Sequence, residues 1–421
     1  MKVLVVGGGG REHAIVHKLS KSPKADRIYC APGNAGISAL AECVPIVATD
    51  VPALVDFAKR EEIDLTVIGM DDPLMLGVVD AFEEAGLRVF GPRKNAAILE
   101  GSKAFSKNLM KKYGIPTADF WEFTSSEAAK AFLRAHKKYP IVLKADGLAL
   151  GKGVLICESE AEALAGVDEI MVDKKFGSAG NTLVIEEFLT GPEVSVLSFC
   201  DGKTVVPMVS AQDHKRALDG DQGLNTGGMG TFSPSQYYTA EHAEYAMKHI
   251  FQPTVDAMAK EGRPFHGIIY FGMMLTPDGP KVLEYNARFG DPETQVVLPR
   301  LKSDLVDIFE ACIDGTLAEQ SIEWEDNAAV CVVLASGGYP VQYQKGYPIQ
   351  GLDSFCGRED LTIYHAGTAF DAEGRIVTSG GRVLGLTALA STLEEAIQKA
   401  YAHIDQISFQ DCFYRHDIGR K

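Results

Sequence analysis

The first hundred residues alternate short apolar runs with stretches of helical periodicity, and this alternation restricts the fold more than any other feature of the sequence. Apolar runs at 2–6, 64–69 and 87–90 have the length of buried strands, and helical stretches at 12–20 and 74–85 separate them. Such a series predicts an α/β domain whose sheet is parallel and has helices on both faces. Ligands of such sheets bind at the loops that follow the strands, here 7–11, 32–36 and 69–72.

The middle of the chain has the pattern of antiparallel strands instead. Residues 194–209 and 271–286 each contain two strand-like runs joined by a glycine turn, which predicts two hairpins flanked by helices, one of them at about 241–260. A final helix is expected after a capping box of Thr392 and Glu395. We therefore expect a multidomain protein of α/β and α+β class with a mostly β C-terminal domain. Its C-terminal strands are expected near 330–335, 362–367 and 382–386.

Composition argues against several classes of protein. The 421 residues suffice for about three compact units, and the net charge of -16 argues against a general nucleic-acid binder. The net charge does not argue against binding of small phosphorylated ligands, because they need only a local cluster of cations. No apolar run approaches the roughly 18 residues of a membrane span. The eight cysteines are scattered without a C-x-x-C pair, as expected of reduced thiols in a cytoplasmic protein.

Four consecutive glycines, 7–10, follow the first apolar run. The dinucleotide-binding pattern G-x-G-x-x-G fails here, because Glu12 or His13 occupies its third glycine position. The loop still favours a phosphate site, since glycines expose N–H groups at a helix N-terminus and Arg11 adds charge. A plain tight turn and a nicotinamide site are the alternatives. His13 taken alone is expected to cap or pack the helix.

A second glycine loop spans residues 144–154. It lacks the spacing of a Walker loop, and Gly153 stands where that motif has Ser or Thr. The expected strand at 141–143 delivers Lys144 to a glycine flap that can close over a triphosphate. The alternative is a glycine-rich hairpin with two solvated lysines.

An acidic strand at 281–286 suggests a metal site. Alternation along it predicts that Val282, Glu284 and Asn286 face one way and that Leu283 and Tyr285 face the other. A carboxylate and an amide oxygen on one face can hold a hard cation, Mg²⁺ or Mn²⁺ rather than zinc. An exposed polar face is the alternative.

Charged groups also precede or follow tight turns in two other places. Arg288 lies four residues beyond Glu284, where a guanidinium can neutralise charge on a phosphoryl group in transit. A Gly-Asp-Pro turn at 290–292 follows it. The charged stretch 213–216 leads into a glycine loop at 225–230 and has the same character, with a solvated surface run as the alternative.

Ten short motifs are spread along the chain: GGREH (9–13), PGNAG (32–36), GSKAF (101–105), KADGLALGKGV (144–154), IEEFL (185–189), QDHKR (212–216), NTGGMG (225–230), RFGDPETQ (288–295), HAGT (365–368) and GGRVL (380–384). Through these motifs the chain resembles, from end to end, the glycinamide ribonucleotide synthetases of the ATP-grasp superfamily.

This resemblance implies an architecture and an ATP site. An N-terminal α/β substrate domain would cover 1–101, an ATP-grasp core 102–327 with an inserted lid at about 121–191, and a C-terminal domain 328–421. ATP would lie between lid and core, with Mg²⁺ or Mn²⁺ on Glu284 and Asn286. The implied ATP-binding residues are Lys103, Lys144, Gly151, Lys152, Gly153, Val154, Glu186, Glu187, Leu189 and Glu193.

The resemblance also implies a reaction between small molecules, with no nucleic acid, membrane or obligate protein partner. The glycine carboxylate would take the γ-phosphoryl group of ATP, and the amine of 5-phosphoribosylamine would then displace phosphate. Arg288 would stabilise the moving phosphoryl group, and Asp213 and Asp291 would orient the amine and glycine. The implied substrate-binding residues are Gly10, Arg11, Glu12, His13, Asn34, Asp71, Lys215, Asn225, Gly227, Gly228, Met229, Pro292 and Glu293. Another ligase of the superfamily and a nicotinamide-dependent dehydrogenase are the alternatives.

One loop departs from the family pattern. Relatives usually carry Gly-Pro-Glu after the strand that ends at Gly69, whereas this chain has Met70-Asp71-Asp72. One of the two aspartates is expected to take over the missing carboxylate. Alternatively, both aspartates only cap the helix expected near Leu74.

Overall fold

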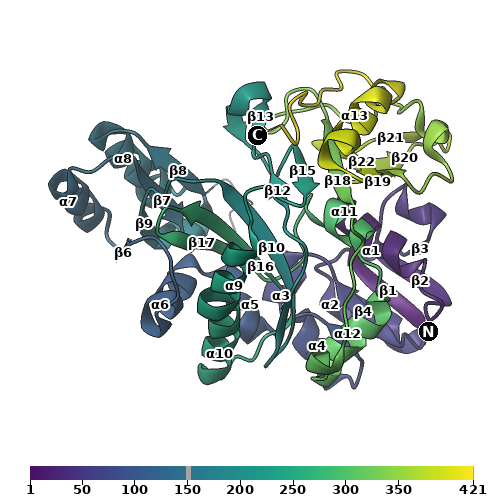
Figure 1. Ribbon diagram of the computed structural model, residues 1–421, viewed down its shortest axis with the longest axis horizontal. Helices are drawn as coiled ribbons and strands as arrows, with labels where there is room; N and C mark the ends of the chain where they lie inside the picture. Colours follow the sequence, from purple (N-terminus) through teal and green to yellow (C-terminus); the bar gives the residue numbers. More distant parts are fainter. Residues whose placement is uncertain (148–152, 421) are drawn as a thin grey trace.

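The computed structural model of the chain describes residues 1–147 and 153–420. Within them, the strands form an N-terminal sheet, a central sheet, a projecting sheet and a C-terminal sheet, together with two small two-stranded ribbons. Figure 1 shows the N-terminal and C-terminal sheets side by side and the projecting sheet at the opposite end of the molecule.

The N-terminal sheet is parallel throughout and has the order β3-β2-β1-β4-β5. Alternate residues of β1 belong to two different cores: Val3 and Val5 pack with Ile15 of α1, and Leu4 and Val6 pack with Phe57 of α2. The predicted parallel sheet with helices on both faces is therefore confirmed. Its elements are β1 (Lys2–Gly7), α1 (Gly10–Leu19), β2 (Arg27–Pro32), β3 (Glu42–Cys43), α2 (Val51–Arg60), β4 (Leu65–Ile68), α3 (Asp71–Met75), α4 (Val78–Glu84), β5 (Val89–Phe90) and α5 (Lys94–Gly101).

Two helices of this region differ from the prediction. The first begins at Gly10 rather than at Glu12, because the Glu12 carboxylate accepts a hydrogen bond from the N–H of Gly9 and caps the helix. The single helix expected at 74–85 is divided into α3 and α4. Gly77 stands between them with φ of +85°, a left-handed conformation that glycine adopts without strain and that ends the first helix.

The central sheet is antiparallel and contains both predicted hairpins. Its order is β11-β10-β16-β17, and helix α12 packs against β10, β16 and β5, so that it joins this sheet to the N-terminal one. The helix expected at 241–260 is continuous from α9 through a π-helical turn into α10. The elements are α6 (Lys103–Tyr113), β10 (Glu193–Asp201), β11 (Val205–Pro207), α9 (Ala240–Ala246), α10 (Gln252–Lys260), β16 (His266–Thr276), β17 (Gly279–Asn286) and α12 (Leu305–Asp314).

A β-bulge in the second hairpin changes which residues of β17 share a face. Gly272 pairs with Glu284 and Met273 pairs with Val282, so Leu283 is the extra residue. Val282 and Tyr285 consequently lie in one buried core, three residues apart. The expectation that Val282 faces the same way as Glu284 is therefore wrong, because strict alternation fails across a bulge.

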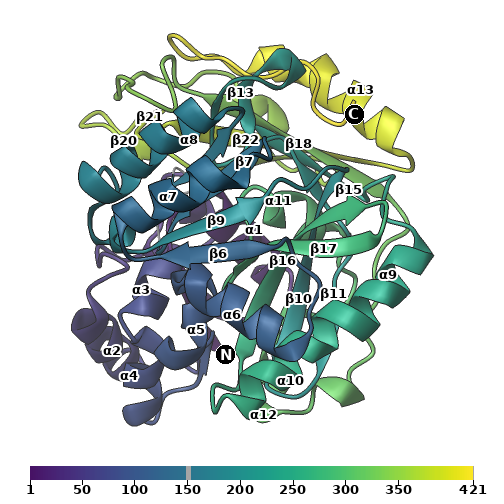
Figure 2. The same cartoon turned by 90° about the vertical axis from the view of Figure 1, so that its left-hand side faces the viewer.

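The projecting sheet has the order β6-β9-β7-β8 and carries helices α7 and α8, which pack against each other. Figure 2 shows this sheet in front of the central one. Its elements are β6 (Phe120–Phe123), α7 (Ser126–His136), β7 (Ile141–Ala145), β8 (Val154–Cys157), α8 (Glu160–Val167) and β9 (Leu183–Glu187).

The C-terminal sheet combines strands from two parts of the chain in the order β12-β15-β18-β22-β19. Helix α13 packs against β18 and β22, and the predicted capping box of Thr392 and Glu395 at its start is confirmed. The elements are β12 (Gln212–Asp213), β15 (Gly230–Ser233), α11 (Thr294–Val297), β18 (Ala328–Ala335), β19 (Leu361–His365), β22 (Arg382–Ala390) and α13 (Leu393–His403), with the ribbons β13 (Arg216–Leu218)–β14 (Gln222–Asn225) and β20 (Thr368–Phe370)–β21 (Ile376–Thr378).

Over the described ranges 1–147 and 153–420, none of the helices has both the length and the apolar character that crossing a membrane requires.

Candidate active site

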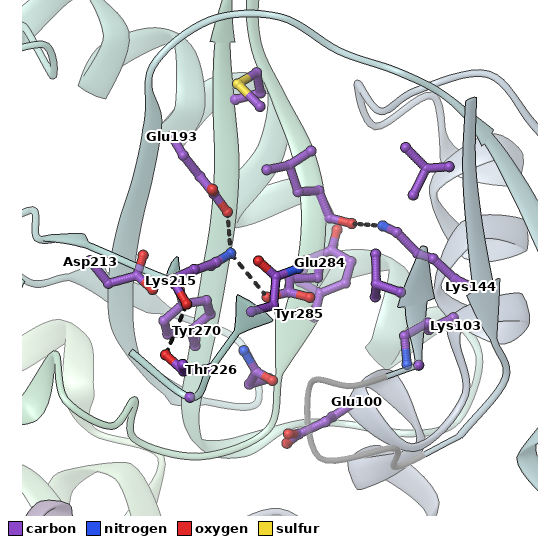
Figure 3. Close-up of a pocket in the computed structure, with 18 of the residues that line it drawn as sticks. Glu100, Lys103, Lys144, Glu193, Asp213, Lys215, Thr226, Tyr270, Glu284 and Tyr285 are labelled. Carbon is purple, nitrogen blue, oxygen red and sulfur yellow. Dashed lines mark hydrogen bonds and ion pairs between the residues drawn. The ribbon is translucent and has the colours of Figure 1, made fainter. Parts of the chain in front are cut away.

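A cavity of about 980 Å³ is lined by residues of the projecting, central and C-terminal sheets and by helices α1, α3 and α5 of the N-terminal region. The projecting sheet contributes Lys144 and Glu186 to its wall, and the central sheet contributes Glu284 and Asn286. The start of β22 in the C-terminal sheet contributes Arg382. Figure 3 shows the labelled side chains converging on this space from both sides. Segments far apart in the sequence thus form a single site.

Three lysines line one end of the cavity, and a buried carboxylate holds two of them. The Glu186 carboxylate pairs with Lys144 at 2.9 Å and with Lys107 at 2.8 Å. Burial acts to raise the pKa of Glu186, but the two ammonium groups outweigh it and lower that pKa. Burial lowers the pKa of Lys107 to about 8. Lys103 donates to the Gly147 carbonyl at 2.9 Å, so this end presents fixed cations suited to phosphates.

The candidate metal ligands lie on β17 beside this cluster. Burial acts to raise the pKa of Glu284, but Lys215 and Lys144 outweigh it, and the lowered pKa keeps the carboxylate ionised. Lys215 lies 3.9 Å from Glu284 and hydrogen-bonds Glu193, as Figure 3 shows. A Cβ on Gly272 would lie 3.1 Å from Cγ of Glu284, so glycine leaves room for this side chain.

This donor set fits a hard cation that the protein shares with a ligand. Glu284 and Asn286 offer oxygen donors on the cavity wall. Among the described residues, no group of three or more His, Cys, Asp or Glu side chains forms a complete metal site. Phosphate oxygens and water would therefore have to complete the coordination, which is the usual arrangement for Mg²⁺.

Arg288 is fixed by two carboxylates from the N-terminal region. Its Nη2 lies 3.0 Å from Glu100 and 3.7 Å from Asp71, and Glu100 also accepts the N–H of Ala287 at 2.7 Å. Burial acts to lower the pKa of Arg288, but these carboxylates outweigh it and raise that pKa. The guanidinium is thus a permanent charge with a set orientation.

Asp291 lies where three regions of the chain meet. Its carboxylate accepts Nε2 of Gln295 at 3.0 Å and the backbone N–H of Arg11 at 3.4 Å, and it lies 3.4 Å from Nη2 of Arg382. Burial acts to raise the pKa of Asp291, but Arg382 and Arg11 outweigh it and the pKa is lowered. The side chain is therefore held as a carboxylate.

A second acidic group combines Asp213, Glu293 and Tyr270. The Tyr270 hydroxyl donates to Glu293 at 3.2 Å. Burial, opposed by Lys215 and reinforced by Glu293, raises the pKa of Asp213 to about 7. This carboxyl can exchange a proton near neutral pH, a property suited to handling an amine.

The cavity wall brings together most of the residues singled out from the sequence, and some lie elsewhere. Those on the wall are Arg11, Asp71, Lys103, Lys144, Gly153, Val154, Glu186, Glu187, Leu189, Glu193, Asp213, Lys215, Asn225, Gly227, Glu284, Asn286, Arg288, Asp291 and Glu293. Those elsewhere are Gly10, Glu12, His13, Asn34, Gly228, Met229 and Pro292. Gly151 and Lys152 fall outside the described residues.

The residues away from the wall support the loops around it. Glu12 caps α1 and pairs with Arg11 at 2.6 Å. His13 accepts the N–H of His365 at 2.8 Å, and the Asn34 amide donates to the His365 carbonyl at 2.8 Å. These contacts fasten the N-terminal loops to the C-terminal region. A substrate contact for Glu12, His13 or Asn34 stays a prediction.

The wall residues that were not among the candidates from the sequence include four with polar or charged side chains that matter below: Glu100, Lys107, Tyr270 and Arg382. A signal existed for Lys107, because it follows Lys103 by four residues and so shares its face of α6. A signal also existed for Arg382, which lies within the GGRVL motif at 380–384, whereas Glu100 and Tyr270 reach the cavity through tertiary packing.

Comparisons with known proteins agree over the whole chain. Models of phosphoribosylglycinamide synthetase match in three parts: the N domain over residues 1–100, the ATP-grasp (A) domain over 101–294 and the C domain over 329–421. Phosphoribosylamine–glycine ligase of Halalkalibacterium halodurans is 52% identical over 421 residues, which cover 100% of this chain and 97% of that protein. The chain belongs to the phosphoribosylglycinamide synthetase family. This membership decides against the dehydrogenase alternative.

Solved structures agree with this family assignment. The crystal structure of phosphoribosylamine–glycine ligase from Thermotoga maritima is 34% identical with a TM-score of 0.87, and it covers 99% of this chain and 100% of its own. The biotin carboxylase domain of Hydrogenobacter thermophilus 2-oxoglutarate carboxylase, solved with MgADP and bicarbonate, is 18% identical with a TM-score of 0.76 over 98% of this chain and 91% of its own. The second likeness shows a shared fold between this synthetase family and the carboxylases.

Proposed function

We propose that the chain joins glycine to 5-phosphoribosylamine in an ATP-dependent reaction that gives glycinamide ribonucleotide, ADP and phosphate. The relatives that support this proposal are named phosphoribosylamine–glycine ligase, and this chain matches them over nearly their full length. The observation that carries it is the single cavity in which fixed lysines, an oxygen-donor pair and a doubly anchored arginine face one another. These are the parts that phosphoryl transfer to a carboxylate requires.

The lysine end of the cavity is our proposed ATP site. Lys103 and Lys144 would contact the phosphates, together with Gly153 and Val154 on the same wall. Glu187 and Leu189 would frame the adenine and Glu193 the ribose. The Glu186 carboxylate pairs with Lys144 and Lys107, so we assign Glu186 the role of orienting these two lysines.

The metal of the proposed site is Mg²⁺ or Mn²⁺, held by Glu284 and Asn286. Such an ion supplies charge neutralisation on the nucleotide phosphates. The chain's own contribution is an ionised Glu284 kept in place by Lys215 and by the space beside Gly272.

The ligation needs positioning and charge rather than a covalent nucleophile. A carboxylate is a poor acyl donor, so glycine is first converted to glycyl phosphate, and the amine of 5-phosphoribosylamine then displaces phosphate. Arg288 stabilises charge on the transferring group. Asp291 and Asp213 are our candidates for orienting glycine and the amine, and the pKa of Asp213 near 7 suits a group that takes up the amine proton.

The domain division that accompanies this function is 1–101, 102–327 with a lid at about 121–191, and 328–421. The projecting sheet supports the lid, since its strands run from Phe120 to Glu187. Strands β12 and β15 belong to the C-terminal sheet, so a boundary at 328 follows the chain rather than the sheet.

The proposed function predicts a strict substrate requirement. ADP is expected to form in proportion to glycinamide ribonucleotide only when glycine, 5-phosphoribosylamine, ATP and a divalent metal are all present. A coupled ADP assay together with mass spectrometry of the product checks this. Turnover with another amino acid and none with glycine would contradict the assignment.

Asp71 is expected to act on the substrate side. Its carboxylate lies on the cavity wall 3.7 Å from Arg288, whereas Asp72 lies off the wall. The N-cap residue of helix α3 is Met70 and makes no side-chain hydrogen bond, but the Asp71 carboxylate accepts the N–H of Asp72 at 3.1 Å, so the capping alternative stays open for Asp71. Asp71→Ala should raise the KM for 5-phosphoribosylamine about tenfold, the scale of one hydrogen bond to a charged group, and leave the KM for ATP unchanged.

Asp72→Ala is the matched control for this prediction and should leave both constants near their wild-type values. Steady-state kinetics and the Tm of each variant separate the possibilities. A lower Tm for Asp71→Ala with an unchanged KM for 5-phosphoribosylamine would reduce Asp71 to a structural residue.

A further inference from the structure

Arg382 brings the C-terminal region into the cavity. It is the first residue of β22, and its side chain is 22% exposed on the cavity wall. None of the chemistry proposed above uses this group, although its charge is permanent.

The guanidinium of Arg382 donates hydrogen bonds to backbone carbonyl oxygens of two separate loops. Nη1 donates to the carbonyl of Gly227 at 2.8 Å and to that of Asp291 at 2.9 Å, with a longer contact to Gly228 at 3.4 Å. Nη2 lies 3.4 Å from the Asp291 carboxylate. Arginine suits this task, because its planar fork offers several donors in fixed directions, whereas lysine presents one point charge.

The glycine loop at 225–230 is shaped to be held in this way. A Cβ on Gly227 would lie 3.0 Å from the guanidinium carbon of Arg382. Gly228 has φ of +115°, and a Cβ there would lie 2.6 Å from Pro292. A second side chain of the C-terminal region, Tyr339, accepts the N–H of Gly227 at 3.1 Å. The loop therefore packs directly against both Arg382 and the Asp291-Pro292 turn.

The same contacts fix the direction of the Asp291 carboxylate. Gln295 and the Arg11 N–H hold it from the central and N-terminal regions, and Arg382 holds it from the C-terminal region. Loss of Arg382 would free both the glycine loop and one side of this carboxylate.

We propose that Arg382 is a positioning residue for the acceptor half of the reaction, fixing the glycine loop and the Asp291 carboxylate at the end of the cavity where amine and acyl group meet. The C-terminal region thereby completes the site. The inference rests on the proposed function, because it assigns the loop and Asp291 to substrate. Arg382 should not affect nucleotide binding, because the lysines at that end of the cavity are held by other groups. Glu186 pairs with Lys144 and Lys107, and the Gly147 carbonyl accepts a hydrogen bond from Lys103.

The test compares Arg382→Ala with Arg375→Ala, an arginine of the same region that is 61% exposed and pairs with Asp371. Arg382→Ala should lower kcat/KM for 5-phosphoribosylamine about a hundredfold, the scale of a small misplacement of reacting groups. The Kd for MgADP, measured by isothermal titration calorimetry, should change less than about twofold. Arg375→Ala should match the wild type in both measurements.

Chemical rescue separates positioning from a purely structural role. Methylguanidinium added to Arg382→Ala should restore at least about a tenth of the lost activity, whereas methylammonium should not, because only the former reproduces the fork of donors. If Arg382→Ala does not fold, Arg382→Lys takes its place and should still lose about tenfold or more in kcat/KM with MgADP affinity retained.

Three results would overturn the inference: kcat/KM within threefold of wild type, a parallel loss of MgADP affinity, or equal rescue by both cations. An assay of the wild-type protein in the same experiment distinguishes a failure of the proposed function from a failure of the inference about Arg382. Wild type that makes no glycinamide ribonucleotide would contradict the proposed function, whereas an active wild type with an unaffected Arg382 variant contradicts only this inference.

Discussion

Replacement of Arg288 by methionine is expected to lower kcat by about a thousandfold or more, the lower end of the effect of an arginine that stabilises a transferring phosphoryl group. Methionine keeps much of the side-chain length and removes the charge. The loss should appear in kcat rather than in the Kd for MgADP, because Arg288 is held by Glu100 and Asp71 and because MgADP lacks the phosphoryl group that Arg288 is proposed to stabilise.

The geometry around Arg288 explains why the effect should be large. Its two carboxylate partners fix the guanidinium before substrate arrives, so little reorganisation is needed during transfer. Arg288→Lys should recover little of the activity, because an ammonium group cannot keep two carboxylate contacts and also face the phosphoryl group.

Single-turnover kinetics with ATP and glycine measure this prediction most directly. Arg263→Met serves as control, since Arg263 donates to the Asn95 carbonyl and lies off the cavity wall. A kcat for Arg288→Met within tenfold of wild type would show that charge on the phosphoryl group is stabilised elsewhere.

Glu284→Ala should reduce turnover by about a hundredfold or more at limiting Mg²⁺, the scale expected when one preorganised charge-stabilising group is removed. The ionised carboxylate is one of two oxygen donors that β17 offers to the cavity. Because Glu284 lies on the wall rather than in the core, the fold should persist, and the Tm should stay near that of the wild type.

Metal binding gives this prediction a readout that does not depend on activity. Titration of Mn²⁺ in the presence of ADP, followed by electron paramagnetic resonance, should show weaker binding to Glu284→Ala. Glu244→Ala is a control on an exposed carboxylate that lies off the cavity wall. Unchanged Mn²⁺ affinity together with near-normal turnover would remove Glu284 from the metal site.

Local pattern in the sequence determined much of the architecture. Buried strands, helical stripes and glycine turns are short-range features, so the parallel N-terminal sheet, the two hairpins and the Thr392 capping box were all predictable. Candidate residues for chemistry were equally visible where motif and residue type coincided, as at Lys144 and Glu284. The division of 74–85 at Gly77 was missed, because a single glycine inside a helical pattern gives a weak signal.

Only the tertiary structure decided which distant groups meet. Glu100 and Ala287 are 187 residues apart, and Arg382 and Asp291 are 91 apart, yet both pairs are in hydrogen-bond contact. The bulge at Leu283 likewise turned Val282 into the core. Such contacts depend on how whole sheets pack and on the register between their strands. Neither can be predicted from the order of neighbouring residues along the chain. The sequence by itself therefore determined the elements and the candidate residues, and the packing of the four sheets decided how those residues combine into one site.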